Sequence, residues 1–361
     1  MQQDINEVQI QQDAWDRYIQ SQRKDIGFVQ SSWWADLQAS VGWSHFGLFF
    51  RDGEQILGGA RLLCRESGTD QCYYYVPEGP VLPSDPDDAD QLLQAFLDHL
   101  DDRRRRSASL VTHLVLEPRW FTVPPLLAGF RQAGSWREPR NTLMVDLACS
   151  DDALLAQMKP KGRYNIHVAR RHGVRVFDDI SESGIDAFLA IHRETVERHS
   201  LNAERARYYR ALCQSLRSSG QGTLLFAARG DERLAAAVIV YAGDRATYLF
   251  GGSRWADRRY MAPYLLHVEA MSRARDAGMR WYDFYGIAPT DSTEHPWAGI
   301  TRFKRQFGGV AQCFIPSLEL IYDRPGYEAY RAAKRGRRAP GNGHQTMVVT
   351  EPPSTQDDRA A

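Results

Sequence analysis

The sequence predicts an α/β protein built from two domains of similar construction. Its 361 residues exceed the roughly 100–200 residues typical of one domain. Segments with strand periodicity alternate with segments of helical periodicity along the chain. The same order, hairpin strands, a helix and a further strand, occurs in each half, although the halves are not alike in sequence. We therefore expect two related α/β units, with the boundary near residues 146–153.

The first half begins with an aromatic segment, residues 10–43, in which Ser31 or Ser32 is suited to cap a helix that carries Trp33 and Trp34. Apolar residues on one stripe predict an amphipathic helix over 91–100. The other elements expected in this half are strands at 44–50, 55–64, 72–76, 110–116 and 142–147, and a short helix at 124–134.

The second half begins with a basic helix over 154–172. Pro263 is suited to the first turn of a later helix and Gly278 to its end. The remaining expected elements are helices at 183–199 and 204–218 and strands at 174–177, 223–229, 234–241, 246–250 and 281–285. From Ala339 to Ala361 the composition becomes rich in Pro, Gly, Thr, Gln and Asp, which predicts a disordered tail.

Composition narrows the function classes. The chain has 45 Lys and Arg against 45 Asp and Glu, so no global field attracts nucleic acid, and any polyanion site must be a local patch. No run approaches the roughly 18 apolar residues of a membrane-spanning helix, and the polar N-terminus lacks a signal-peptide core. The five cysteines form no CxxC pair. We expect a cytoplasmic protein with reduced, mostly buried thiols and no metal site.

The segment Gly299–Gly309 is the most informative part of the chain. Phe303 and Phe307 are four residues apart, so both can anchor one helical turn to a core. Lys304 then projects from a fixed element, which suits a cation that stabilises a phosphate or an oxyanion. The alternative is an ordinary amphipathic turn with a solvated lysine, and residue types alone favour that alternative.

Several segments, in this order and spacing, carry a resemblance to a known family. The strongest are Tyr248–Ser253, Ala262–Leu266, Tyr282–Ile287, His295-Pro296, Phe303-Lys304 and Phe307–Gly309, with weaker matches at Gln30–Trp33, Tyr75–Val81, Lys161–Ile166 and Tyr327–Arg338. Together they resemble the Fem family of peptidoglycan-bridge aminoacyltransferases, from about residue 26 to residue 338.

The resemblance implies two tandem acetyltransferase-like domains, residues 1–147 and 148–317, with a C-terminal helix, 318–338, that returns to the first. It implies transfer of an amino acid from aminoacyl-tRNA to an amine of a peptidoglycan stem peptide, on a lipid-linked or UDP-linked precursor. No cofactor is implied. The expected location is the cytoplasm, with the inner face of the plasma membrane as one option. Larger members carry a coiled-coil arm, but this chain has no sustained heptads and resembles the armless form.

The same resemblance assigns catalytic roles. Lys304 would stabilise phosphate or oxyanion charge, with Phe303 fixing its position. Asp283 is the carboxylate best placed for proton transfer, although pairing with a nearby arginine is the interpretation that we favour for it. His295 is a weaker candidate that suits shaping a loop.

Substrate binding would involve the following residues. Arg205 and Tyr209 lie four apart on an expected helix and can face one diphosphate; the alternative is a surface arginine beside a half-buried tyrosine. Tyr248 precedes Gly251 and Ser253, where glycine permits close approach of a ligand or forms a β-bulge. Tyr75 precedes a rigid turn beside the acceptor groove.

Residues 158–175 contain a run of cations and no acid. Such a run is usually a solvated face, but the absence of compensating acids favours a polyanion partner. We expect contact with the tRNA acceptor stem through Lys159, Lys161, Arg163, Arg170 and Arg171. A second basic helix, 327–338, would meet either tRNA or an anionic membrane surface.

Two departures from the family keep different functions open. Family members carry a lysine near the position of Gln38 and often a basic residue where Glu78 stands, and both bind phosphate. The loss of the lysine weakens the case for a UDP-linked acceptor and leaves a lipid-linked or altered acceptor open, and Glu78 puts phosphate contact at its position in doubt. A coenzyme-A-dependent N-acyltransferase would need a glycine-rich loop, and residues 258–263 lack it. A binding module that has lost its chemistry also fits the sequence, as does a tRNA-dependent transferase with a non-peptidoglycan acceptor.

Overall fold

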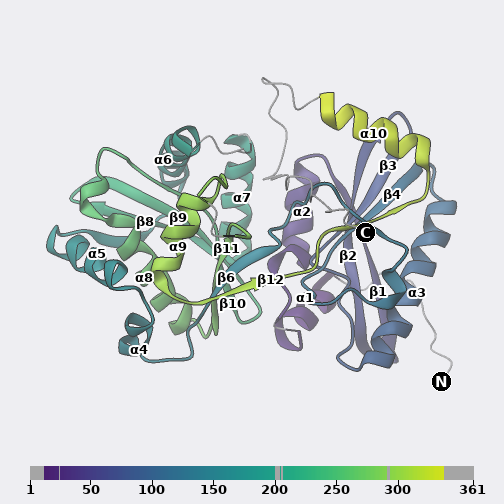
Figure 1. Ribbon diagram of the computed structural model, residues 1–361, viewed down its shortest axis with the longest axis horizontal. Helices are drawn as coiled ribbons and strands as arrows, with labels where there is room; N and C mark the ends of the chain where they lie inside the picture. Colours follow the sequence, from purple (N-terminus) through teal and green to yellow (C-terminus); the bar gives the residue numbers. More distant parts are fainter. Residues whose placement is uncertain (1–11, 24, 200–203, 205, 291–292, 337–361) are drawn as a thin grey trace, which may run out of the picture.

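The computed structural model describes residues 12–336 except residues 24, 200–203, 205 and 291–292. Two domains lie side by side, each built around one mixed sheet (Figure 1). The first sheet has the order β1-β2-β3-β4-β13-β5 and the second the order β12-β6-β11-β10-β9-β8-β7. This arrangement confirms the expected two-domain α/β fold.

The strands have these bounds. The first sheet contains β1 (Ser44–Asp52), β2 (Gln55–Gly68), β3 (Gln71–Pro77), β4 (Leu110–Glu117), β5 (Arg131–Gln132) and β13 (Leu318–Ile321). The second contains β6 (Asn141–Asp146), β7 (Arg175–Asp178), β8 (Gly222–Arg229), β9 (Glu232–Ala242), β10 (Arg245–Ser253), β11 (Trp281–Gly286) and β12 (Val310–Cys313).

The helices cover the faces of the two sheets. The α-helices are α1 (Gln12–Ser21), α2 (Ser32–Ser40), α3 (Pro86–Arg105), α4 (Asp151–Ala156), α5 (Pro160–Arg171), α6 (Glu182–His199), α7 (Ala206–Ser219), α8 (Ala262–Asp276), α9 (Ala298–Lys304) and α10 (Arg324–Gly336). Short 3-10 turns are η1 (Phe28–Gln30), η2 (Pro125–Leu127), η3 (Arg258–Tyr260) and η4 (Arg305–Phe307).

The two domains share one topological unit. In the first, β1, β2 and β3 are antiparallel, and α3 then leads to β4, which lies parallel to β3. In the second, β8, β9 and β10 are antiparallel, and α8 leads to β11, parallel to β10. A parallel neighbour requires a crossover connection, which each helix supplies. The expected recurrence of hairpin strands, helix and strand is therefore confirmed.

Two strands cross between the domains. β6 follows the first domain along the chain, yet it pairs with β11 and β12 in the second sheet. β13 follows the second domain, yet it pairs with β4 and β5 in the first. If the domains are divided by the sheet to which each strand belongs, the second domain begins at Asn141 with β6. The expected boundary, after residue 147, lies at the end of that strand. The helix expected over 318–338 is wrong in its first part, because residues 318–321 pair as β13; α10 follows and packs on the first sheet beside β4 (Figure 1).

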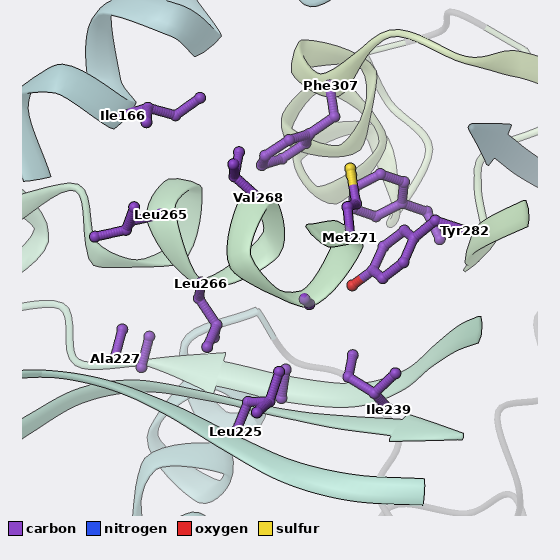
Figure 2. Packing of buried hydrophobic residues seen from close by; sticks show 14 of the residues in the cluster. Ile166, Leu225, Ala227, Ile239, Leu265, Leu266, Val268, Met271, Tyr282 and Phe307 are labelled. Atoms are coloured by element: carbon purple, nitrogen blue, oxygen red, sulfur yellow. The ribbon is translucent and has the colours of Figure 1, made fainter. Parts of the chain in front are cut away.

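Helix α8 organises the core of the second domain. Figure 2 shows Leu265, Leu266 and Met271 of this helix between β8–β9 residues and the aromatic side chains of Tyr282 and Phe307. A separate cluster joins the domains, because Phe28, Val29, Trp34 and Leu37 pack with residues of α6, α7 and the second sheet. Burial of this apolar surface fixes α2 against α7.

Proline chemistry explains where helices differ from expectation. The helix expected over 154–172 is two helices, α4 and α5, because Pro160 has no N–H and holds Lys159 in an extended conformation. The helix expected at 124–134 is wrong: Pro124 and Pro125 restrict it to the turn η2, and β5 follows.

The longest helix in the described part of the chain, α3, packs against the first sheet, so no arm projects there. The tail 339–361 lies outside the described residues.

Within the described residues, no helix combines the length and apolar character needed to cross a membrane.

Candidate active site

Lys304 lies at the end of a short, firmly anchored helix. Phe307 is fully buried and Phe303 is half-buried, with ring centroids 5.3 Å apart. Tyr264 of α8 contacts both rings, at 5.2 Å from Phe303 and 5.7 Å from Phe307. The expected anchoring of this turn by two phenylalanines is confirmed.

The ammonium group of Lys304 is withdrawn from solvent. The side chain belongs to a residue that is 5% exposed, and Nζ donates a hydrogen bond to the carbonyl of Gly286 at 2.6 Å. It lies 5.7 Å from the centroid of the Tyr248 ring. Burial lowers the pKa of Lys304 to about 7, while the charge of Asp283 acts in the opposite direction. The alternative of a solvated lysine on an ordinary turn is therefore wrong.

A β-bulge places Tyr248 beside this cation. The register of β10 against β9 shifts between Tyr248 and Phe250. Gly251 makes room for the tyrosine, since an added Cβ would lie 2.4 Å from Tyr248 Oη. The backbone of Ser253 is bound by Thr195 of α6, which donates to its carbonyl at 3.3 Å and accepts from its amide at 2.9 Å. The glycine thus serves packing within the protein at a β-bulge, which is one of the two roles expected from sequence.

Asp283 is a structural carboxylate at the junction of the domains. It is fully buried, it accepts hydrogen bonds from Thr142 Oγ1 and from the amide of Tyr285 at 2.7 Å, and it pairs with Arg119 at 3.2 Å. Arg245 lies 3.8 Å away. Pairing with an arginine, the interpretation favoured from sequence, describes the observed geometry, and no part of the carboxylate faces solvent.

Tyr209 lies in the cluster between α6, α7 and β10. Its ring packs 4.6 Å from His192 and 5.0 Å from Phe250, and its hydroxyl accepts a hydrogen bond from the amide of Glu204 at 3.1 Å. Its neighbour Tyr208 bonds to the side chain of Gln38 on α2. Arg205 lies outside the described residues, so its pairing with Tyr209 stays a prediction.

Tyr75 lies in β3 of the first sheet. It is buried beneath α2 and Trp43, and its hydroxyl donates to Glu117 Oε2 at 2.6 Å. Glu78, in the turn that follows, is buried and pairs with Arg119 at 3.2 Å. A role for Tyr75 beside the acceptor groove stays a prediction, and the turn after it serves the ion pairs of the domain junction.

The basic helix α5 abuts the Lys304 segment. The amide of Lys159 donates to the carbonyl of Gln306 at 3.0 Å, and Gly162 packs so closely that an added Cβ would lie 2.6 Å from the same oxygen. The cations that line its surface are Lys159, Lys161, Arg170 and Arg171, all exposed. Arg163 differs, because it is half-buried and donates to the carbonyl of Met158. The expected contacts of these five residues with tRNA stay predictions.

Residues that sequence reasoning missed surround a cavity of about 430 Å³ at the domain junction. Arg119 and Glu138 are the charged residues of this lining that the sequence analysis did not identify. The signal that the sequence offers for them is their position next to Pro118 and Pro139. The lining comprises Glu78, Glu117, Pro118, Arg119, Gln132, Ala133, Gly134, Trp136, Glu138, Pro139, Arg140, Phe314, Ile315, Pro316 and Ser317.

Across the described residues, no group of three or more His, Cys, Asp and Glu side chains is arranged to hold a metal ion. All five cysteines are free thiols. The expectation that most are buried is wrong, because only Cys72 and Cys213 are buried and Cys313 is exposed.

Comparisons with known proteins agree with this geometry. Lipid II:glycine glycyltransferase of Staphylococcus epidermidis is 19% identical over 85% of this chain and 90% of its own length. The protein of the same name from Staphylococcus saprophyticus is 18% identical over 90% of this chain and 95% of its own. A crystal structure of FemX shares the fold, with a TM-score of 0.79 and 18% identity over 89% of this chain and 98% of that one.

The model of the FemAB family matches residues 127–228 and 220–335, which is more than half of the chain. This match includes β6, the basic helix α5, the bulged strand β10 and the Lys304 segment. The expected membership is confirmed, and with it the expected class, since the relatives above are named as acyl-transferring enzymes. The chain belongs to the FemAB family.

Proposed function

We propose that this protein transfers an amino acid from aminoacyl-tRNA to an amine of a lipid-linked peptidoglycan stem peptide. The observation that carries the proposal is Lys304, a buried cation fixed by Gly286 and Tyr248 next to an exposed basic helix. The names of the relatives support lipid II as the kind of acceptor.

The geometry suits attack by an amine on an activated ester. The neutral amine forms a bond to the ester carbonyl, whose oxygen becomes an oxyanion. The Lys304 ammonium donates one of its protons in the hydrogen bond to the carbonyl of Gly286, and the remaining protons are available for hydrogen bonds to that oxyanion. The bond to the tRNA ribose then breaks, and the ribose oxygen takes a proton.

The exposed cations of α5 support the tRNA part of the proposal. Because the helix begins at the Lys304 segment, an RNA bound along its surface would end near the ammonium group. Nearby Tyr164 is 61% exposed and offers a ring for base stacking. We further propose that catalysis occurs in the cytoplasm at the inner membrane face, where a lipid-linked acceptor resides and where the basic residues of α10 would meet anionic lipid.

Gln38 supports a lipid-linked over a UDP-linked acceptor. Its uncharged side chain is buried and bonded to Tyr208, so this position supplies no cation for a nucleotide diphosphate.

Reconstitution tests the proposal. Purified protein, charged tRNA and lipid II in detergent should give an aminoacylated precursor detectable by mass spectrometry, and RNase treatment of the charged tRNA should abolish it. UDP-linked precursor forms the second arm and should react more slowly. The absence of transfer with every charged tRNA and both precursors would exclude the function, and tight binding of acetyl-CoA by calorimetry would favour the coenzyme-A alternative.

A further inference from the structure

Glu138 occupies a special position at the domain junction. It precedes β6, the strand that leaves the first domain for the second sheet, and it lines the cavity of about 430 Å³. Residues of the first domain and of the two segments that connect the domains form the walls, and Trp136, Phe314 and Pro316 supply apolar surface. A cavity of this size accommodates an extended aliphatic side chain with a polar end.

The three carboxylates of the cavity differ in the hydrogen bonds and ion pairs that they form within the protein. Glu117 accepts hydrogen bonds from the hydroxyls of Tyr75 and Ser317 and from the amides of Arg137 and Glu138. Glu78 is paired with Arg119 at 3.2 Å. Glu138 accepts the hydroxyl of Tyr285 at Oε2, and no described residue donates a hydrogen bond to its Oε1. Glu138 therefore retains the capacity to bind a ligand.

Tyr285 connects this carboxylate to Lys304. Its backbone is left-handed, with φ of +59°, and its amide is bound to Asp283 at 2.7 Å. A left-handed tyrosine is an unfavourable conformation that persists where surrounding contacts enforce it, often at functional sites. The turn directs the Tyr285 side chain to Glu138, while the next residue, Gly286, presents its carbonyl to Lys304 Nζ.

We propose that Glu138 is the proton acceptor for the attacking amine of the acceptor. The inference rests on the proposed function and assigns its missing base. The amine enters the cavity as an ammonium group and gives one proton to the Glu138 carboxylate. The neutral amine then forms the bond to the ester carbonyl at Lys304, the ester bond to the ribose breaks, and a second amine proton leaves with the ribose oxygen. Glu138 afterwards returns its proton to solvent.

The electrostatics of the site agree with this role. Burial, with the nearby charges of Glu117 and Glu78, raises the pKa of Glu138 to about 8, whereas the Tyr285 hydrogen bond and the charge of Arg137 oppose the shift. Arg119 and Arg140 also line the cavity. At pH 7 about one-tenth of the free protein carries the ionised carboxylate, and a base with a pKa near the working pH is effective in proton transfer.

The test compares wild-type protein with Glu138→Gln, whose amide oxygen still accepts the Tyr285 hydroxyl. With an ordinary ammonium acceptor, the variant should lose roughly 10²–10⁴-fold in kcat, which is the usual contribution of a general base. The wild-type rate should rise with pH to a maximum between about 7 and about 8, and the variant should lose the rise. An aminooxy analogue of the acceptor is neutral at pH 7, so wild type and variant should transfer to it within about tenfold of each other.

Two further variants complete the design. Tyr285→Phe removes the hydrogen bond that lowers the pKa of Glu138, so the pH of maximal rate should increase, and this measurement is informative even where Glu138→Gln fails to fold. Glu54→Gln, an exposed carboxylate on the β1–β2 turn, serves as the matched control and should behave as wild type.

Three results would overturn the inference while wild-type transfer remains intact: an unchanged rate in Glu138→Gln, an unchanged pH profile in Tyr285→Phe, or an equal loss with both acceptors. A wild-type protein that transfers to neither acceptor would instead reject the proposed function on which the inference rests.

Discussion

Arg119 of the first domain and Asp283 of the second are joined by an ion pair of 3.2 Å. The same guanidinium pairs with Glu78 at 3.2 Å; both carboxylates are buried, and the Arg119 side chain is 14% exposed. Arg245 lies 3.9 Å from Glu78 and 3.8 Å from Asp283, so four charges form one network across the junction. This network fixes Asp283, and through the amide of Tyr285 it fixes the turn that holds Lys304.

Arg119→Met should destabilise the protein strongly. It leaves two buried carboxylates with the more distant Arg245 alone, and removing one partner of a buried pair typically costs about 3–5 kcal/mol in the free energy of unfolding. Urea denaturation measures this change. The control is Arg105→Met, which breaks an exposed pair with Asp101 at 2.6 Å and should cost less than about 1 kcal/mol. Equal losses in the two variants would contradict the importance of the network.

Lys304→Ala should lower kcat by roughly 10²–10³-fold, the usual effect of losing one oxyanion donor. It should also weaken acceptor binding if Lys304 contacts phosphate. Single-turnover kinetics with charged tRNA separate these effects from product release. Wild-type kinetics from the alanine variant would exclude the role of the cation.

The pH profile should report the titration of Lys304. Its pKa is lowered to about 7, so the charged fraction, and with it the rate, should decline as pH rises through that value. Together with a base that ionises near pH 8, this gives a bell-shaped profile with its maximum between the two values. Lys304→Arg keeps its charge at all these pH values and should abolish the decline. A decline that persists in the arginine variant would assign it to another group.

Gly251→Ala should damage both stability and transfer. The added Cβ would lie 2.4 Å from Tyr248 Oη and 2.7 Å from the carbonyl of Ala236, so the bulge must shift and Tyr248 must leave Lys304. Overpacking of this kind costs about 1–3 kcal/mol. The matched control is Gly299→Ala in α9, where no atom lies within 4 Å, and its stability should be unchanged or raised by up to about 1 kcal/mol. Thermal denaturation and the transfer assay compare the two.

Neutralising the exposed face of α5 should weaken tRNA binding. Lys161→Gln with Arg170→Gln and Arg171→Gln removes three cations, which should reduce the slope of log K against log salt by up to about two to three units. Arg105→Gln with Arg106→Gln, exposed on the other domain, is the control and should leave the slope unchanged. Filter binding at several salt concentrations measures it. Equal slopes in wild type and the triple variant would place the RNA elsewhere.

The fold was largely predictable because its signals are local. Alternation predicted the long strands of both domains, and the spacing of Phe303 and Phe307 predicted the anchored turn around Lys304. The failures are local as well: Pro160 divides the basic segment, and Pro124 and Pro125 replace a helix with a turn.

The site was predictable only in part. Lys304 lies in a patterned segment, so its neighbours along the chain reveal its fixed position. Glu138 and Arg119 owe their environments to residues far away in sequence, Tyr285 and Asp283, which only the assembled domains bring close. The periodicity of a sequence does not predict contacts with such distant residues. The residues next to Glu138 in the chain also do not predict the burial that raises its pKa.

The position of β13 in the first sheet has a consequence for how the protein is made. A ribosome releases the N-terminal half first, and chains commonly fold domain by domain in that order. Here β13 lies between β4 and β5, so the first sheet stays incomplete until residues 318–321 have been synthesised. The nascent first half would expose the edge of β4 while residues 118–321 are synthesised, which makes that edge a natural site for chaperone protection.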